Sequence, residues 1–162
     1  MVEKTVCPIA KSQLVVGDRW TMLILRELFM GNCRFEGLQA QTEATPQMLA
    51  ARIKKLEADG MTERFPYNTR PLRYEYKLTA KGQAFFPVVL ALRAWGETWC
   101  KLPDEGLAVR LIHLHCGQDA GLGPTCQSCG APLYQNELIQ ELGSKFKKER
   151  AARNKAFRTR TG

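Results

Sequence analysis

The sequence lacks any long hydrophobic run. No apolar stretch in the 162 residues approaches the about 20 residues that a membrane-spanning helix requires. The opening stretch MVEKTVCPIA also lacks the apolar core of a signal peptide. We therefore expect a cytoplasmic protein with no membrane partner. In that compartment its six cysteines should serve as thiols, metal ligands or redox sensors and not as structural disulfides.

Catalytic motifs are also missing. The sequence contains no nucleophile elbow, no phosphate-binding glycine loop and no histidine–carboxylate constellation. The only two histidines, His113 and His115, lie in a segment rich in cysteine and glycine. We therefore expect a protein that is not an enzyme.

Negative charge is scarce in the C-terminal tail. The chain has a net charge of +8, and residues 145–162 hold eight lysines and arginines against Glu149 alone. The tail therefore carries +7, which leaves +1 for residues 1–144. The high pI is a property of the tail and says nothing about the folded body. Two interpretations stay open: the tail adds nonspecific DNA affinity, or it is a solvated, flexible end.

Residues 45–60, TPQMLAARIKKLEADG, predict a short amphipathic helix. Thr45 can cap its start and Gly60 can end it. Apolar residues for a core recur at i, i+4 and i+7, namely Leu49, Ile53 and Leu56. The remaining surface carries small, polar and positive residues, namely Gln47, Ala51, Arg52, Lys54 and Lys55. This surface is either an ordinary solvated face or a slim face that enters a DNA groove.

The neighbouring segments complete a winged-helix order. CPIAKSQLVV predicts a short helix, DRWTMLILRELFMG a buried helix, and RFEGLQAQTEA a weak helix followed by a turn. With the helix at 45–59, the last of these forms a helix-turn-helix. Strict alternation in LRYEYKL predicts a half-buried strand, which MTERFPY can pair through the exposed loop NTRPL. A helix-turn-helix followed by a β-hairpin is the order of a winged helix.

Residues 80–100, AKGQAFFPVVLALRAWGETWC, predict one long helix that is bent at Pro87. The helix is apolar on more than one face, and a body this small cannot easily bury all of that surface. We therefore expect the helix to form the seam of a homodimer. The alternative is that the first helices of the same chain cover it.

Two short motifs predict a metal site. HLHCG and CQSCG give the spacings His113-x-x-Cys116-Gly and Cys126-x-x-Cys129-Gly, which fit a small tetrahedral zinc ribbon. Such a structural zinc would take His113, Cys116, Cys126 and Cys129, with His115 competing for the histidine position. The alternatives are metal-free packing or disulfides formed in air. After this segment, NELIQELGSKF at 136–146 predicts a further helix that runs into the basic tail.

The motifs resemble the HxlR-type transcriptional regulators, a bacterial winged-helix family. The resemblance covers about residues 7–100 and rests on CPIA, GDRWTMLILRELFMG, RFEGL, TPQMLAARIKKLEADG, YEYKLTAKG and ALRAWGETW. It implies a homodimeric, nucleoid-associated regulator that binds double-stranded DNA. The residues expected to contact DNA are Arg34, Thr45, Gln47, Met48, Ala51, Arg52, Lys54, Lys55, Arg70 and Arg73. In several members a cysteine at the place of Cys7 senses oxidants or electrophiles; here Cys7 is either such a sensor or an unreactive thiol.

The expected fold is therefore mainly α with a small β-hairpin. We expect a winged helix-turn-helix with its dimerisation helix at residues 1–100, a zinc-ribbon-like segment at 107–133, and a helix with a basic tail at 134–162. The expected function is regulation of transcription by a DNA-binding homodimer, responsive to an oxidant or a small molecule. The alternative is an RNA- or protein-binding adaptor that uses the ribbon and the tail.

Overall fold

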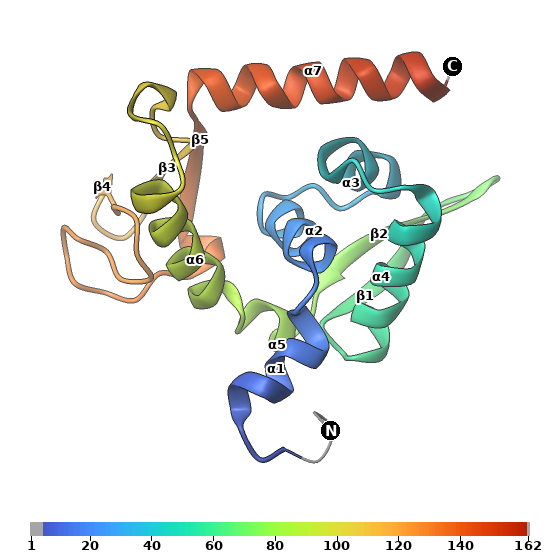
Figure 1. Ribbon diagram of the computed structural model, residues 1–162, viewed down its shortest axis with the longest axis horizontal. Coiled ribbons are helices and arrows are strands. Elements are labelled where there is room, and N and C mark those ends of the chain that lie inside the picture. The colour runs from blue at the N-terminus through green and yellow to red at the C-terminus, as the bar shows by residue number, and fades with distance from the viewer. Residues whose placement is uncertain (1–4, 162) are drawn as a thin grey trace. The chain divides into compact units, whose positions relative to one another are not determined.

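Figure 1 shows the computed structural model, which describes residues 5–161. The chain divides into two compact units, residues 1–82 and residues 83–162, and each unit is described by itself. Among the described residues, no helix combines the length and the apolar character needed to cross a membrane.

The first unit is a helix-turn-helix followed by a β-hairpin. Its elements are α1 (Pro8–Val16), α2 (Arg19–Phe29), α3 (Phe35–Thr42), α4 (Pro46–Ala58), β1 (Thr62–Thr69), β2 (Leu72–Leu78) and the short α5 (Ala80–Gln83). Helices α2, α3 and α4 pack against one another, and the antiparallel hairpin packs along α4 and α2 (Figure 1). This arrangement is the predicted winged helix-turn-helix.

The core of the first unit lies between α2, α3 and α4. Ile24 and Leu25 of α2 and Leu38 of α3 are completely buried. The three predicted stripe residues of α4 join them, namely Leu49, Ile53 and Leu56. Burial of each such side chain contributes about 1.5–3 kcal/mol relative to exposure. The stripe therefore fixes which side of α4 faces inward and which side remains at the surface.

Asp18 joins the start of α2 to α4. Its carboxylate accepts hydrogen bonds from the backbone N–H groups of Trp20 and Thr21 at 3.0 Å and from the Thr21 hydroxyl at 2.5 Å. The same carboxylate lies 3.2 Å from Nε of Arg52 in α4. Burial opposes ionisation of Asp18, but the hydrogen bonds and the guanidinium outweigh it and lower the pKa of the carboxyl below 3.8. One side chain therefore caps α2 and anchors α4.

The second unit contains a long helix, a small sheet and a terminal helix. Its elements are α6 (Phe86–Trp99), η2 (Pro103–Glu105), β3 (Val109–His113), β4 (Gln118–Asp119), η3 (Gln135–Glu137), β5 (Leu138–Leu142) and α7 (Ser144–Thr161). The sheet is antiparallel with the order β4-β3-β5, and His113 pairs with Leu138 at one end of the β3–β5 ladder. The Cys/His segment lies between β3 and β5.

Two predicted helices differ in the structure. The segment predicted as a single helix at 80–100 forms two helices, α5 and α6, with a break after Gln83. Pro87 lies in the first turn of α6, where its missing N–H costs nothing. The helix predicted at 136–146 is wrong, because residues 138–142 form β5. Leu138 and Leu142 alternate with exposed Ile139 and Glu141, and pairing with β3 prevails over helix propensity. The basic tail is helical through residue 161.

Candidate nucleic-acid interface and metal centre

The outward side of α4 is slim and exposed. Gln47, Ala51 and Lys54 follow one another at i, i+4 and i+7, and all three are exposed. Met48 is also exposed. Thr45 caps the helix, because its hydroxyl accepts a hydrogen bond from the N–H of Met48 at 3.3 Å. The side opposite the core therefore has the width and polarity that a DNA groove accepts.

Several of the predicted DNA-binding cations already have carboxylate partners. In addition to Arg52 on Asp18, Nζ of Lys55 lies 2.6 Å from Asp59, and Nη1 of Arg73 lies 3.6 Å from Glu36. To bind DNA, each of these cations would have to interact with its carboxylate and with a phosphate at the same time. Among the described residues, the side chains of Lys54 and Arg70 have no such partner, and both are exposed. These two cations can meet a phosphate without losing an ion pair.

Arg34 lies at the base of the hairpin and remains exposed. Its guanidinium lies over the ring of Tyr67, 4.3 Å from the ring centroid. Its backbone forms an isolated bridge with Glu75 of β2, which ties the start of α3 to the hairpin. The aromatic contact orients the guanidinium at the surface, and the sequence carries no local signal for it.

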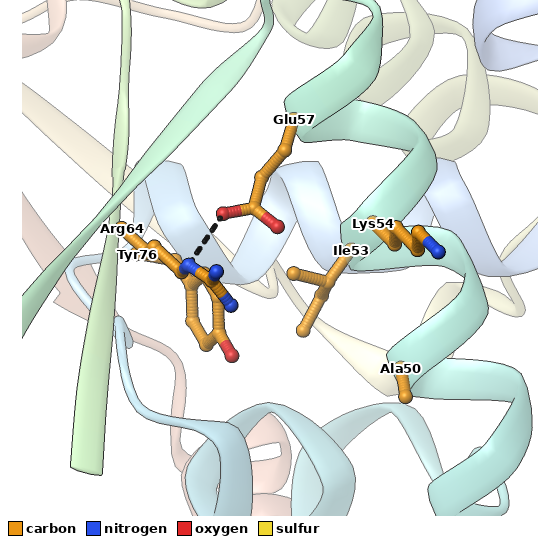
Figure 2. Close-up of a pocket in the computed structure, with 6 residues that line it drawn as sticks. All are labelled: Ala50, Ile53, Lys54, Glu57, Arg64 and Tyr76. Atoms are coloured by element: carbon orange, nitrogen blue, oxygen red, sulfur yellow. Dashed lines mark ion pairs between the residues drawn. The ribbon is translucent and has the colours of Figure 1, made fainter. Parts of the chain in front are cut away.

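A groove separates α4 from the hairpin. It has a volume of about 660 Å³ and is lined by Ala50, Ile53, Lys54, Glu57, Arg64 and Tyr76. Figure 2 shows Glu57 of α4 facing Arg64 of β1, with 3.6 Å between their charged groups. Burial raises the pKa of the Tyr76 hydroxyl, with a smaller contribution from Glu57. The ion pair holds the hairpin at a fixed place beside α4, and sequence reasoning missed both of its residues.

The Cys/His segment gathers four ligand atoms. Those of His113, Cys116, Cys126 and Cys129 all lie within 4.8 Å of one another. The Sγ of Cys116 lies 3.8 Å from that of Cys126 and 3.7 Å from Nδ1 of His113, which in turn lies 3.4 Å from Sγ of Cys129. The structure therefore brings together the four residues predicted as ligands, and the cluster could hold a metal ion.

Two glycine turns shape the cluster. Gly117 and Gly130 have φ values of 69° and 76°, in the left-handed region that favours glycine. Their N–H groups donate to the carbonyl oxygens of His113 at 2.7 Å and Cys126 at 2.9 Å. Each turn therefore reverses the chain just after a ligand pair, as the Cys-Gly motifs predict.

His113, and not His115, belongs to the cluster. The ring of His113 is fully buried and its Nδ1 faces the sulfurs. Its Nε2 is buried without a hydrogen bond among the described residues and lies 3.7 Å from a carboxylate oxygen of Glu137. The ring of His115 is 5.8 Å away between centroids. Sequence reasoning missed Glu137, which the fold brings in from the turn before β5.

The pKa values of Cys126 and Cys129 are shifted in opposite directions. Burial raises the pKa of Cys126, but the N–H groups of Cys129 and Ser128 outweigh it and lower this pKa to about 6. For Cys129, the N–H of Ala131 lowers the pKa, but burial together with Cys126 and Cys116 raises it overall. Thiolates this close to one another repel, so a bound cation would stabilise all of them.

Three cysteines lie outside the His/Cys cluster, namely Cys7, Cys33 and Cys100. Cys7 is exposed and immediately precedes Pro8, the first residue of α1. Cys33 is half-buried, with its sulfur 3.9 Å from a carboxylate oxygen of Glu75, and Cys100 is exposed. No disulfide joins any of the six cysteines, all of which lie within residues 5–161.

Helix α6 exposes an apolar stripe. Val88, Leu92, Trp95 and Trp99 recur at i, i+4, i+7 and i+11, and their exposed fractions are 49%, 49%, 58% and 74%. Phe86 and Leu90, on another side of the helix, are buried. A seven-residue apolar repeat of this kind fits a second helix laid along it.

Comparisons with known proteins agree with these features. The family model described as HxlR-like helix-turn-helix matches residues 15–104. The chain is 36% identical over 138 residues to an uncharacterized HTH-type transcriptional regulator of Mycobacterium tuberculosis, and the match covers 85% of this chain and 87% of the relative. The family match ends at residue 104, and the likeness to this relative continues further into the second unit.

Two solved structures share the fold. PA1607, described as a candidate transcription factor, matches with a TM-score of 0.67 at 36% identity, over 83% of this chain and 94% of its own. The redox regulator HypR in its oxidized form matches with a TM-score of 0.54 at 30% identity, over 59% of this chain and 100% of its own. These likenesses confirm the predicted fold class.

Metal content tests the His/Cys cluster. Protein purified without a chelator should carry about one divalent metal ion per chain, because four ligand atoms converge. Cys126→Ser and His113→Gln should each bring the content below about half an equivalent by elemental mass spectrometry, since a tetrahedral site does not hold metal well with three ligands. Cys100→Ser and His115→Gln are the matched controls and should keep the metal. A full-length protein with less than about half an equivalent would exclude the site.

Proposed function

Because the chain belongs to the HxlR-like helix-turn-helix family and is a transcriptional regulator, we propose that it binds double-stranded DNA as a homodimer and places α4 in the major groove. Its relatives are regulators, which confirms the prediction that it is not an enzyme. We infer that it acts in the cytoplasm, at the nucleoid.

The exposed side of α4, formed by Gln47, Ala51 and Lys54, is the main support for this proposal. Gln47 lies in the first turn of α4, where recognition helices commonly reach base edges. Ala51 lets the helix approach the bases closely, and Lys54 has its full charge available for a phosphate or a guanine edge. Arg70 extends the contact from the tip of the hairpin to the backbone or to a neighbouring minor groove. Arg52 is paired with Asp18, which attaches α4 to the start of α2, so a phosphate would share the charge of Arg52 with that carboxylate.

The exposed stripe on α6 supports the homodimer. Four large apolar side chains on one helix face would cost free energy in water, and two of them are tryptophans. A second copy of α6 offers the same repeat, so a two-fold axis pairs like with like. A two-fold dimer would present two copies of α4 to two half-sites of a partly palindromic operator.

Zinc is the metal that the His/Cys cluster suits best. Zinc bound to sulfur at about 2.3 Å and to nitrogen at about 2.1 Å in a tetrahedron places its ligand atoms about 3.6–3.8 Å apart. Three of the six separations, 3.4, 3.7 and 3.8 Å, lie near these tetrahedron edges, and all six are within 4.8 Å. Three thiolates and one imidazole fill the coordination shell, so the zinc would be structural. Glu137 would orient His113 through its Nε2.

Cys7 is the thiol through which an oxidant or electrophile would act. Its sulfur is exposed next to the start of α1, so a small reagent can reach it. HypR, which shares the fold, is a redox regulator. This supports a redox-responsive role for the first unit, with the natural oxidant undefined.

DNA binding tests the role of α4. Affinity for a selected operator should fall about 10³–10⁵-fold between about 50 and about 200 mM salt if the dimer neutralises about 6–10 phosphates. Ala51→Glu should abolish specific binding, and Lys54→Gln should lower the salt slope by about 1 per protomer. Lys11→Gln removes the same charge from α1 and is the matched control. A protein that binds RNA but no duplex DNA would favour the adaptor alternative.

The oligomeric state tests the stripe on α6. Leu92→Glu places a charge in the middle of the stripe and should convert the dimer to a monomer in light scattering, with the helix content retained. Thr98→Glu adds the same charge to an exposed position beside the stripe and should leave the dimer intact. A wild-type chain that is monomeric at micromolar concentration would contradict the dimer.

Oxidation tests Cys7. Treatment with diamide or a quinone should change the DNA affinity of the wild-type protein, because Cys7 is the exposed thiol of the DNA-binding unit. Cys7→Ser should abolish this response, and Cys33→Ser should keep it, since Cys33 is half-buried. Unchanged binding after treatment, with Cys7 confirmed as modified by mass spectrometry, would exclude the sensor role.

A further inference from the structure

The basic C-terminal tail is an ordered, anchored helix. Figure 1 shows α7 leaving β5 as one straight helix, and 18 residues give it a length of about 27 Å. The residue before α7 is Gly143, whose N–H donates a hydrogen bond to the carbonyl oxygen of Ala108 at 2.9 Å. Nζ of Lys145 pairs with the carboxylate of Asp104 at 2.8 Å. The start of α7 is therefore fixed to the small sheet of its own unit.

Helix α7 has two different faces. The residues of one face are half-buried and recur at i, i+4, i+7 and i+11, namely Phe146, Arg150, Arg153 and Phe157. The opposite face is exposed and carries cations separated by alanines, namely Lys147, Lys148, Ala151, Ala152, Lys155 and Arg158. None of these four cations has an ion-pair partner within residues 5–161. The exposed face therefore repeats the pattern of α4: small side chains for close approach and free positive charge.

The charges of α7 oppose one another in water. Its first turn has no acidic residue but contains Lys145 and Lys147, whose charges oppose the helix dipole. Glu149 is the only acidic residue from 144 to 161, and its carboxylate is paired with Arg153 at 2.7 Å. Cations three residues apart, such as Lys155 and Arg158, repel each other. A polyanion bound along the exposed face would neutralise these cations and so remove the repulsion between them.

We propose that the exposed face of α7 is a second DNA-binding surface, which contacts the phosphate backbone of duplex DNA. This inference rests on the proposed function, because the partner is duplex DNA. The contact is largely independent of sequence, since lysine and arginine dominate the face and pair with phosphates, while Asn154 is the one amide side chain on the helix. Specificity then belongs to α4, and α7 contributes affinity and salt dependence.

The test replaces the four free cations in the full chain by glutamine. The variant is Lys147→Gln, Lys148→Gln, Lys155→Gln and Arg158→Gln, and glutamine keeps the helix propensity. Its charge-conserving control exchanges lysine and arginine at the same four positions. Affinity is measured against salt on two duplexes of about 30 bp, a selected operator and a random sequence, with helix content followed by circular dichroism.

The glutamine variant should lose at least about tenfold in affinity for both duplexes at about 0.1 M salt. The slope of log K against log salt should fall by about 2–4 per protomer, at about 0.9 for each lost phosphate contact. The preference for the operator over the random duplex should not change, and the control should behave as the wild type. An unchanged slope with helix content retained would overturn the role of α7 alone. A wild-type chain that binds no duplex would overturn the proposed function as well.

Discussion

The carboxylate of Asp18 fixes α4 in the first unit. It caps α2 through two backbone N–H groups and holds the guanidinium of Arg52 at 3.2 Å. The buried side chains of Leu49, Ile53 and Leu56 hold α4 against the core. The ion pair between Arg52 and the carboxylate that caps α2 adds a polar attachment, which opposes rotation of α4 about its axis. The outward strip of α4 faces solvent in a defined direction as a result.

A half-buried arginine, Arg93, joins separate segments in the second unit. The guanidinium of Arg93 in α6 donates to the carbonyl oxygens of Gly121 at 3.2 Å and Leu122 at 3.1 Å, and also to that of Val109. Burial lowers the pKa of this guanidinium, with Glu97 opposing the shift. The Cys/His segment is thereby attached to one side of α6, while the apolar stripe remains exposed. These hydrogen bonds join the Cys/His segment to the helix that we propose as the dimer seam.

Sequence patterns predicted the local features and missed the long-range ones. The stripe and cap of α4, the alternating strands of the hairpin and the paired Cys-Gly turns all depend on spacings of a few residues, and the structure has them. The strand at 138–142 depends on pairing with the distant β3, whereas the break before α6 lies close to Pro87, where the sequence predicted only a bend. The partners of Arg52 and Arg64 could not be read either, because ion pairs between elements leave no periodic signal. His113 was separable from His115 only once β3 placed one ring inward.

Charge and shape are divided between different helices. The first unit, residues 1–82, has thirteen lysines and arginines against nine acidic residues, a net charge of +4, and residues 83–144 carry −3. The first unit therefore attracts a polyanion less strongly than the +7 tail does. The +7 of the tail is concentrated on α7, whose exposed face is dominated by lysine and arginine. Under our proposals, long-range attraction comes from α7 and base discrimination from α4. A change in α7 should then alter how tightly the protein binds any duplex, while a change in α4 should alter which duplex it prefers.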